Sequence, residues 1–242
     1  MKKPAPKPET KPLYPMRINK YLAWMKYATR KGGDEMVQNG KVYINGKRAV
    51  HGDKIQATDK VEVNSNKKPK NYEYYAYYKP RGVISHSPQR GEKDIRKASA
   101  LKHVFPLGRL DKDSEGLIIL TNDGRITDFL LNPKYEHDKE YIVTVSNPMR
   151  TNFAKIMSEG VDIEGYMTKP AKVKVVDEYR FKITLTEGKK HQIRRMCSAL
   201  HNEVRELKRL RVMNIELGNL PSGSYRAIVG EELEIFLKSL GF

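Results

Sequence analysis

The sequence predicts an α+β fold made of a small N-terminal unit and a larger C-terminal unit. Segments with the alternating apolar and polar residues of β-strands outnumber segments with helical spacing, and the two kinds do not alternate regularly along the chain. That order favours a mainly antiparallel sheet flanked by helices over a doubly wound parallel sheet. A polar, lysine-rich stretch over 64–71 is typical of a linker between the two units.

The N-terminal unit is expected over 16–63, after a disordered basic tail of alternating proline and lysine over 1–15. Thr29 is a suitable N-cap for a second helix, and Asn45-Gly46 suits a hairpin turn between two short strands. A first helix is indicated by apolar residues at helical spacing, namely Ile18, Tyr21, Leu22 and Met25.

The C-terminal unit, over 72–242, opens with a tyrosine-rich strand that ends at Lys79-Pro80, and a second strand follows within 108–123. Three further segments rich in Val, Ile, Thr and Tyr are predicted strands: 139–145, 171–179 and 180–188. Helical spacing predicts four helices, within 125–132, 151–160, 191–202 and 230–240.

Charge indicates the class of partner. The 242 residues carry a formal net charge of +17, which exceeds what solubility requires and points to nucleic acid. No apolar run approaches the 20 or so residues that a membrane helix needs, so no membrane partner is expected. A single cysteine, Cys197, suits a reducing compartment, and we expect the cytoplasm.

A cluster of acids precedes the most apolar strand, in the stretch "GRLDKDSEGLIILTND" over 108–123. Asp111, Asp113 and Glu115 match the start of a calcium loop, but the twelfth position, which requires a bidentate glutamate, is Asn122. Short polar side chains that stabilise a turn are the simpler explanation. Phosphate-loop, dinucleotide and zinc-deaminase motifs are missing, which leaves an aspartate that could itself attack carbon.

Four segments together resemble one family. "GRLDKDSEGL" is similar to the catalytic segment of the RsuA/RluB/RluE/RluF family of bacterial pseudouridine synthases, and "YYKPRGV" to its K-P-x-G segment. "KEYIVTV" and "EGKKHQIRRMC" are similar to its tyrosine strand and its arginine helix. Residues 16–62 resemble an S4 RNA-binding domain. The resemblance thus implies an S4 domain followed by a pseudouridine synthase domain with a mixed, mainly antiparallel sheet.

The resemblance also assigns roles. Asp111 would be the catalytic residue, and Arg194 would pair with it and keep it charged in an apolar pocket. Tyr141 would stack on the uracil, and Arg109 would occupy the space that the target nucleotide vacates when it is flipped out. Lys79 would contact the RNA backbone or support the pocket, and a purely structural role at the end of its strand is the alternative. An ionised Asp111 suits attack on either the uracil ring or C1′ of the ribose.

Phosphate contacts are expected mainly from the S4-like unit. Lys189 and Arg195, beside Arg194, are further candidates in the C-terminal unit. The S4-like candidates are Arg17, Lys20, Lys26, Arg30, Lys31, Lys41, Lys47 and Arg48. Gly32 and Gly33 stand where the family has helix formers, and each should destabilise the second helix by roughly 1 kcal/mol relative to alanine.

The predicted function is isomerisation of a uridine to pseudouridine in ribosomal RNA by a monomer that needs no cofactor and no metal. "LKRLRVMNIEL" most resembles the RluF subgroup and favours 23S rRNA. A 16S-directed synthase like RsuA is the nearest alternative, and a tRNA stem-loop is a further possible substrate. An alternative of another class is a non-catalytic RNA-binding or ribosome-assembly protein that keeps the fold.

Overall fold

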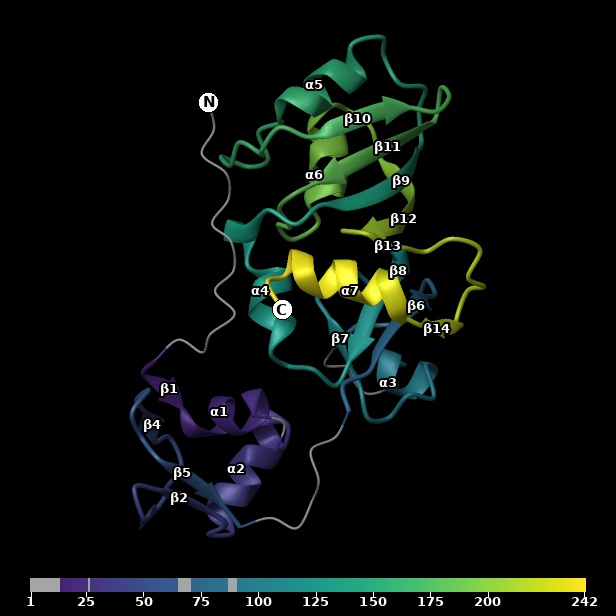
Figure 1. The fold of residues 1–242 in the computed structure, drawn as a ribbon. Helices are drawn as coiled ribbons and strands as arrows, with labels where there is room; N and C mark the ends of the chain where they lie inside the picture. Colours follow the sequence, from purple (N-terminus) through teal and green to yellow (C-terminus); the bar gives the residue numbers. More distant parts are fainter. Residues whose placement is uncertain (1–13, 26, 65–70, 87–90) are drawn as a thin grey trace.

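The computed structural model describes residues 14–25, 27–64, 71–86 and 91–242, and it consists of two units (Figure 1). The predicted tail over 1–15 and linker over 64–71 lie almost entirely outside the described residues. Lys26 lies outside them as well. None of the helices that the structure describes is both long and apolar enough to cross a membrane.

Two helices and five short strands form the N-terminal unit, as the sequence predicts for the helices and the hairpin. In chain order the elements are β1 (Met16–Arg17), α1 (Ile18–Trp24), α2 (Arg30–Gln38), β2 (Val42–Ile44), β3 (Lys47–Arg48), β4 (Lys54–Ile55) and β5 (Val61–Val63). Thr29 caps α2, because its hydroxyl accepts a hydrogen bond from the Gly32 amide at 3.1 Å. Asn45 and Gly46 both have positive φ and close the β2–β3 hairpin.

The two glycines of α2 have a structural reason. A Cβ atom on Gly33 would lie 3.2 Å from the Asn19 carbonyl oxygen and 3.4 Å from the Leu22 side chain, both in α1. Glycine therefore lets the two helices approach closely, and this packing offsets part of the lower helix propensity. The helix continues through both positions to Gln38.

A nine-stranded sheet is the framework of the C-terminal unit. Its strand order is β10-β11-β9-β12-β8-β6-β14, with β13 on β12 and β7 on β8. The strands are β6 (Tyr74–Lys79), β7 (Phe105–Leu107), β8 (Glu115–Thr121), β9 (Lys139–Val145), β10 (Lys172–Val175), β11 (Arg180–Leu185), β12 (Val204–Val212), β13 (Ile215–Glu216) and β14 (Tyr225–Ala227). The pairings are antiparallel except for β8 with β12, so the predicted mainly antiparallel mixed sheet is confirmed.

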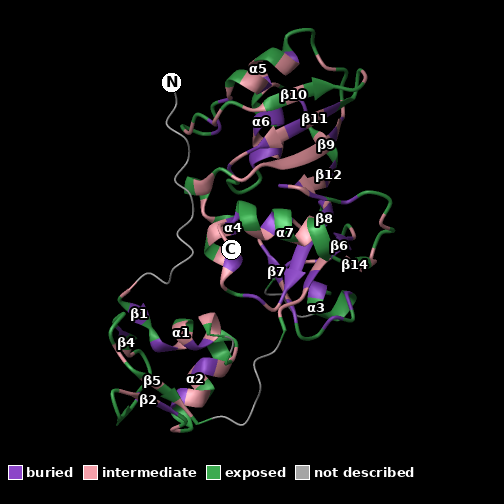
Figure 2. Cartoon of the chain, viewed as in Figure 1, coloured by how far each residue is buried: buried purple, intermediate pink, exposed green. Residues whose placement is uncertain are grey.

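Helices cover the sheet in two groups (Figures 1 and 2). In one half, α5 (Phe153–Glu159) and α6 (Gln192–Ala199) pack on β9 and β11. In the other half, α4 (Ile126–Leu131) and α7 (Gly230–Ser239) pack on one face of β6 and β8, and the short α3 (Ile95–Ala98) packs on the opposite face. A single 3-10 turn, η1 (Pro133–Tyr135), precedes β9. The β8 strand is buried on both faces, which explains its continuous apolar run.

The central strand β12 was not predicted. Five charged side chains interrupt its apolar pattern between Val204 and Val212, so the period of two is hidden in the sequence. Its parallel pairing with β8 joins the two halves of the sheet. Gly116 makes this approach possible, because a Cβ atom there would lie 2.4 Å from the Arg209 carbonyl oxygen.

Candidate active site

Asp111 lies in the loop between β7 and β8. β8 begins at Glu115, within the predicted range of 108–123, so Arg109 and Asp111 precede this strand. Side chains nevertheless alternate: Leu110 is buried, whereas Arg109 is exposed and Asp111 is partly exposed. A turn follows directly, in which the Ser114 amide donates to the Asp111 carbonyl oxygen at 3.1 Å. The loop thus presents Arg109 and Asp111 away from the core.

The three acids of this stretch have different neighbours. The Asp111 carboxylate lies 3.5 Å from Nε2 of His191, and Glu115 lies 3.4 Å from the Lys208 ammonium. Asp113 is exposed, and its backbone carbonyl rather than its carboxylate takes part in a hydrogen bond. The acids therefore do not converge on one point, as the ligands of a calcium loop would.

Lys79 does not contact solvent, so its predicted role as an RNA backbone contact is contradicted. Its side chain is 0% exposed, and its ammonium donates to the carbonyl oxygens of Pro80 at 2.9 Å and Val83 at 2.7 Å. Burial lowers the pKa of Lys79 to about 8, although the negative charge of Asp111 acts in the opposite direction. The alternative role, support of the pocket, agrees with this geometry.

The segment after Lys79 holds the Asp111 loop in place. The Gly82 amide donates to the Lys112 carbonyl oxygen at 2.7 Å. The Ser85 hydroxyl donates to the Leu110 carbonyl oxygen at 2.9 Å and accepts from the Leu110 amide at 3.0 Å. Lys79 therefore fixes the turn over 80–83, and that turn fixes the backbone on both sides of Asp111.

Arg194 also supports this loop, but not through the expected ion pair. Its guanidinium donates to the carbonyl oxygens of Val204 at 3.1 Å and Asp113 at 3.2 Å, and it lies 3.5 Å from the buried Ser114 hydroxyl. No ion pair joins it to Asp111, and both residues belong to the described part of the chain. In this structure the side chain that faces the Asp111 carboxylate is His191, at the N-terminal end of α6.

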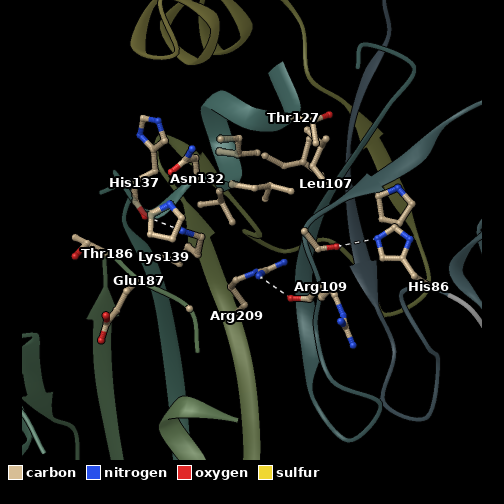
Figure 3. Close-up of a pocket in the computed structure, with 18 of the residues that line it drawn as sticks. His86, Leu107, Arg109, Thr127, Asn132, His137, Lys139, Thr186, Glu187 and Arg209 are labelled. Atoms are coloured by element: carbon tan, nitrogen blue, oxygen red, sulfur yellow. Dashed lines mark hydrogen bonds between the residues drawn. The ribbon is translucent and has the colours of Figure 1, made fainter. Parts of the chain in front are cut away.

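A cavity of about 490 Å³ opens beside the loop (Figure 3). Its lining includes Arg109 and Tyr141, two of the predicted site residues, together with Lys139 and Arg209. Apolar side chains of β7, β8, α4 and β12 form much of the remaining wall, including Leu107, Ile119, Leu130, Leu131 and Val212. The cavity thus combines apolar walls with a few polar groups, as ligand sites do.

The strand register explains how these polar groups meet. Tyr141 of β9 lies opposite Arg209 of β12, and Lys139 lies two residues before Tyr141 on the same face. Arg209 is 4% exposed and donates to the Leu117 and Arg109 carbonyl oxygens, at 2.6 Å and 3.4 Å. Arg209 therefore connects the tyrosine strand to the loop that carries Arg109 and Asp111.

The other predicted RNA contacts fall into two groups. In the C-terminal unit, Arg195 is bound to the Ile163 carbonyl oxygen and the Glu164 carboxylate, at 2.9 Å and 2.7 Å, and the Lys189 ammonium lies 4.2 Å from the centre of the Tyr166 ring. In the N-terminal unit the described cations are all exposed: Arg17, Lys20, Arg30, Lys31, Lys41, Lys47 and Arg48. Exposure suits contact with phosphates, whereas Arg195 is engaged within the protein.

Sequence reasoning missed His191, Lys139 and Arg209. His191 is the first residue of the helix predicted within 191–202, but in the structure it has positive φ and directly precedes α6, and its position in the sequence gives no sign of contact with Asp111. Lys139 lies two residues before Tyr141 in "KEYIVTV", the segment that resembles the tyrosine strand of the family. Its place in this segment is the feature of the sequence that could have identified it as a site residue. Arg209 is one of three arginines in β12, a strand that was not predicted.

Comparison with known proteins identifies the family of both units. A model of the RNA pseudouridylate synthase family matches residues 73–199, and a model of the S4 domain matches residues 16–61. The family match covers the residues of the site described above that precede β12, whereas Val204, Lys208, Arg209 and Val212 lie outside it. The chain belongs to the RNA pseudouridine synthase family.

Relatives match far beyond the two family segments. The dual-specificity RNA pseudouridine synthase RluF of Escherichia coli K12 is 40% identical over 90% of this chain and 77% of its own length. The ribosomal large subunit pseudouridine synthase B of Bacillus subtilis is 34% identical, over 90% and 94% of the two chains. The ribosomal small subunit pseudouridine synthase A of Pasteurella multocida is 32% identical, over 92% and 100%. The RsuA/RluB/RluE/RluF branch of the pseudouridine synthase family is therefore confirmed.

The fold of this pseudouridine synthase is also found in an experimental structure. A crystal structure of a pseudouridylate synthase matches with a TM-score of 0.67 and 28% identity, over 93% of this chain and 99% of that chain. The S4 domain, the synthase fold and an isomerase activity are thus all supported by similarity.

Proposed function

We propose that this synthase isomerises one uridine of ribosomal RNA to pseudouridine, with 23S rRNA as the favoured substrate. The observation that carries the proposal is the 40% identity to RluF over nearly the whole chain, together with a partly exposed Asp111 in the loop whose Arg109 lines a cavity of about 490 Å³. A 16S substrate remains the alternative that the similarity to the small subunit synthase supports.

In this proposal Asp111 is the catalytic residue. The reaction breaks the bond between N1 of uracil and C1′ of the ribose, turns the base, joins C5 to C1′ and releases the C5 proton. A carboxylate can form the transient covalent bond that such an exchange requires, on either the ring or C1′. Tyr141 lines the cavity where the ring would lie and would stack on it.

Arg109 would take the place of the flipped uridine in the RNA. Its side chain is exposed at the rim of the cavity and makes no hydrogen bond or ion pair within the described protein. A stacked uridine exposes neither C1′ nor C5 for attack, so extrusion must precede chemistry, and filling the vacated space lowers its cost of a few kcal/mol. Ribosomal RNA as substrate would place the protein in the cytoplasm.

Tritium release tests the proposal directly. Fragments of 23S rRNA, 16S rRNA and tRNA are labelled with tritium at C5 of uridine and incubated with the full chain. We expect release from a 23S fragment, since each isomerisation frees one C5 hydrogen. Release from a 16S fragment alone would identify 16S rRNA as the substrate in place of 23S rRNA. No release from any fragment would leave a non-catalytic RNA-binding protein.

A further inference from the structure

Three cations line the cavity but have few partners. They are Arg109, Lys139 and Arg209, which Figure 3 shows around one space. The carboxylate in the lining, Glu187, is 5% exposed and already accepts hydrogen bonds from the Tyr166 hydroxyl, the Gln192 amide group and the Lys169 backbone amide. Positive charge in the cavity is therefore not balanced by its own lining.

Lys139 keeps most of its donor capacity. Its ammonium donates one hydrogen bond within the described protein, to the His137 carbonyl oxygen at 2.8 Å, and an ammonium has three donors. Burial, followed by the positive charge of Arg209, lowers the pKa of Lys139 to about 8, although the negative charge of Asp138, itself paired with Arg211, acts in the opposite direction. The site therefore holds a cation that burial disfavours and that a nearby cation disfavours further.

Arg209 is in a similar position. The acceptors of its hydrogen bonds are two backbone carbonyl oxygens, so in the described part of the protein no carboxylate neutralises it. A buried charge without a counter-charge is costly unless a ligand supplies one. Tyr141 lies opposite Arg209 in the sheet and two residues beyond Lys139, so both cations flank the place proposed for the uracil ring.

We propose that Lys139 and Arg209 form an anion subsite that binds a phosphodiester group of the RNA inside the cavity, next to the flipped uridine. This inference rests on the proposed function and names how the same site holds its substrate. An anion relieves the repulsion between the two cations and forms charge-assisted hydrogen bonds with their free donors, whereas a neutral base can accept hydrogen bonds but brings no counter-charge. The volume of about 490 Å³ falls in the range of roughly 300–1,000 Å³ that holds ligands larger than one base.

Nucleotide binding by the full chain tests the subsite without catalysis. Uridine, uridine 5′-monophosphate, uridine 3′-monophosphate and inorganic phosphate are titrated, and the side-chain nitrogen signal of Lys139 is followed by NMR. We expect one of the two monophosphates to bind at least about tenfold more tightly than uridine, with competition by inorganic phosphate, because charge-assisted hydrogen bonds are added.

Matched variants assign the effect. Lys139→Gln should abolish the preference for the monophosphate, Lys139→Arg should retain it, and Lys155→Gln should leave it unchanged. Lys155 is an exposed lysine of α5, so this control removes the same charge outside the cavity. Thermal melting of each variant shows whether it is folded.

Two results would overturn the subsite: equal affinity for uridine and both monophosphates, or a preference that survives Lys139→Gln. Failure of the proposed function is recognisable separately. Phosphate binding that depends on Lys139, without tritium release from any RNA, would retain the anion subsite and reject the synthase activity on RNA. Tritium release without phosphate binding at Lys139 would retain the synthase activity and reject the anion subsite.

Discussion

The two units of this protein both present positive charge, but in opposite environments. In the N-terminal unit the described cations are exposed on a small α/β framework, and in the C-terminal unit Lys79, Lys139 and Arg209 are wholly or largely withdrawn from solvent. Exposed cations interact with phosphates at long range and are screened by salt. Withdrawn cations are screened little, and each needs a defined acceptor.

This difference suggests separate roles, with RNA attachment by the N-terminal unit and the isomerisation reaction in the C-terminal unit. On the proposed function, the N-terminal unit would hold RNA largely independently of sequence, because phosphate contacts carry no sequence information. The cavity of the C-terminal unit is lined by Arg109 from the loop that carries Asp111 and by residues of β9 and β12, so its shape depends on how these segments are placed. Variants in the two regions should therefore fail in different assays.

Asp111→Asn should give the largest effect. The amide keeps the shape of the side chain but cannot form the covalent bond, so tritium release should fall by at least about 1,000-fold while RNA affinity changes only a few-fold. Single-turnover release and filter binding measure the two quantities. Retained turnover would remove Asp111 from the proposed mechanism.

Arg194→Ala should reduce the rate strongly through the loop. The variant removes hydrogen bonds to Val204 and Asp113 and the contact with Ser114, and a small displacement of a catalytic group can cost about 100-fold in rate. Arg194→Lys, which retains one donor group, should recover part of the activity. Equal activity of the alanine variant and the wild type would show that the loop does not need this support.

Lys79→Met should change how stability depends on pH. The folded pKa of about 8 lies below that of an unfolded lysine, about 10.4, so between these values the unfolded chain binds more protons and the free energy of unfolding rises with pH. Each such lysine contributes about 1.4 kcal/mol per pH unit. Lys139 contributes in the same direction, and buried Cys197, whose pKa is raised to about 12, acts in the opposite direction above about pH 8.5, so the variant should lose about 1.4 kcal/mol per pH unit of slope relative to the wild type. Urea unfolding between pH 7.5 and 10.5, roughly the span of these pKa values, measures the slope of the free energy of unfolding against pH. The same slope in the variant and the wild type would contradict the lowered pKa of Lys79.

Neutralising the exposed cations should have a moderate effect on binding alone. For Lys31→Gln combined with Lys47→Gln we expect the slope of log affinity against log salt to become less steep by about 1 to 2 units, if both lysines contact phosphates. The rate at saturating RNA should stay unchanged. A changed rate with an unchanged slope would contradict the assignment of RNA binding to the N-terminal unit and of the reaction to the C-terminal unit.

Asp113→Ala and Glu115→Ala should give the smallest effects. The Asp113 side chain is exposed, and the Glu115 pair with Lys208 is partly exposed, so each change should alter stability by about 1 kcal/mol or less and leave tritium release nearly intact. Chelation with EDTA should change neither variant. Losses equal to that of Asp111→Asn would indicate a shared role for the acids.

The sequence alone determined the elements with clear local patterns. The hairpin at Asn45-Gly46, the cap at Thr29 and the strand over 139–145 are confirmed because turn chemistry, capping and alternation are local properties. The segments that resemble the synthase family also identified the family, which the comparisons confirm.

Tertiary structure decided what the charged residues do. Burial of Lys79, the hydrogen bonds of Arg194 to a distant loop and the position of Arg209 opposite Tyr141 all depend on pairings between segments far apart in the chain. A lysine or arginine has the same local signature whether it faces solvent, a carbonyl oxygen or a cavity. The parallel pairing of β8 with β12 places Arg209 beside the loop that carries Asp111. The charged residues of β12 hide its strand pattern, so the sequence did not reveal this pairing.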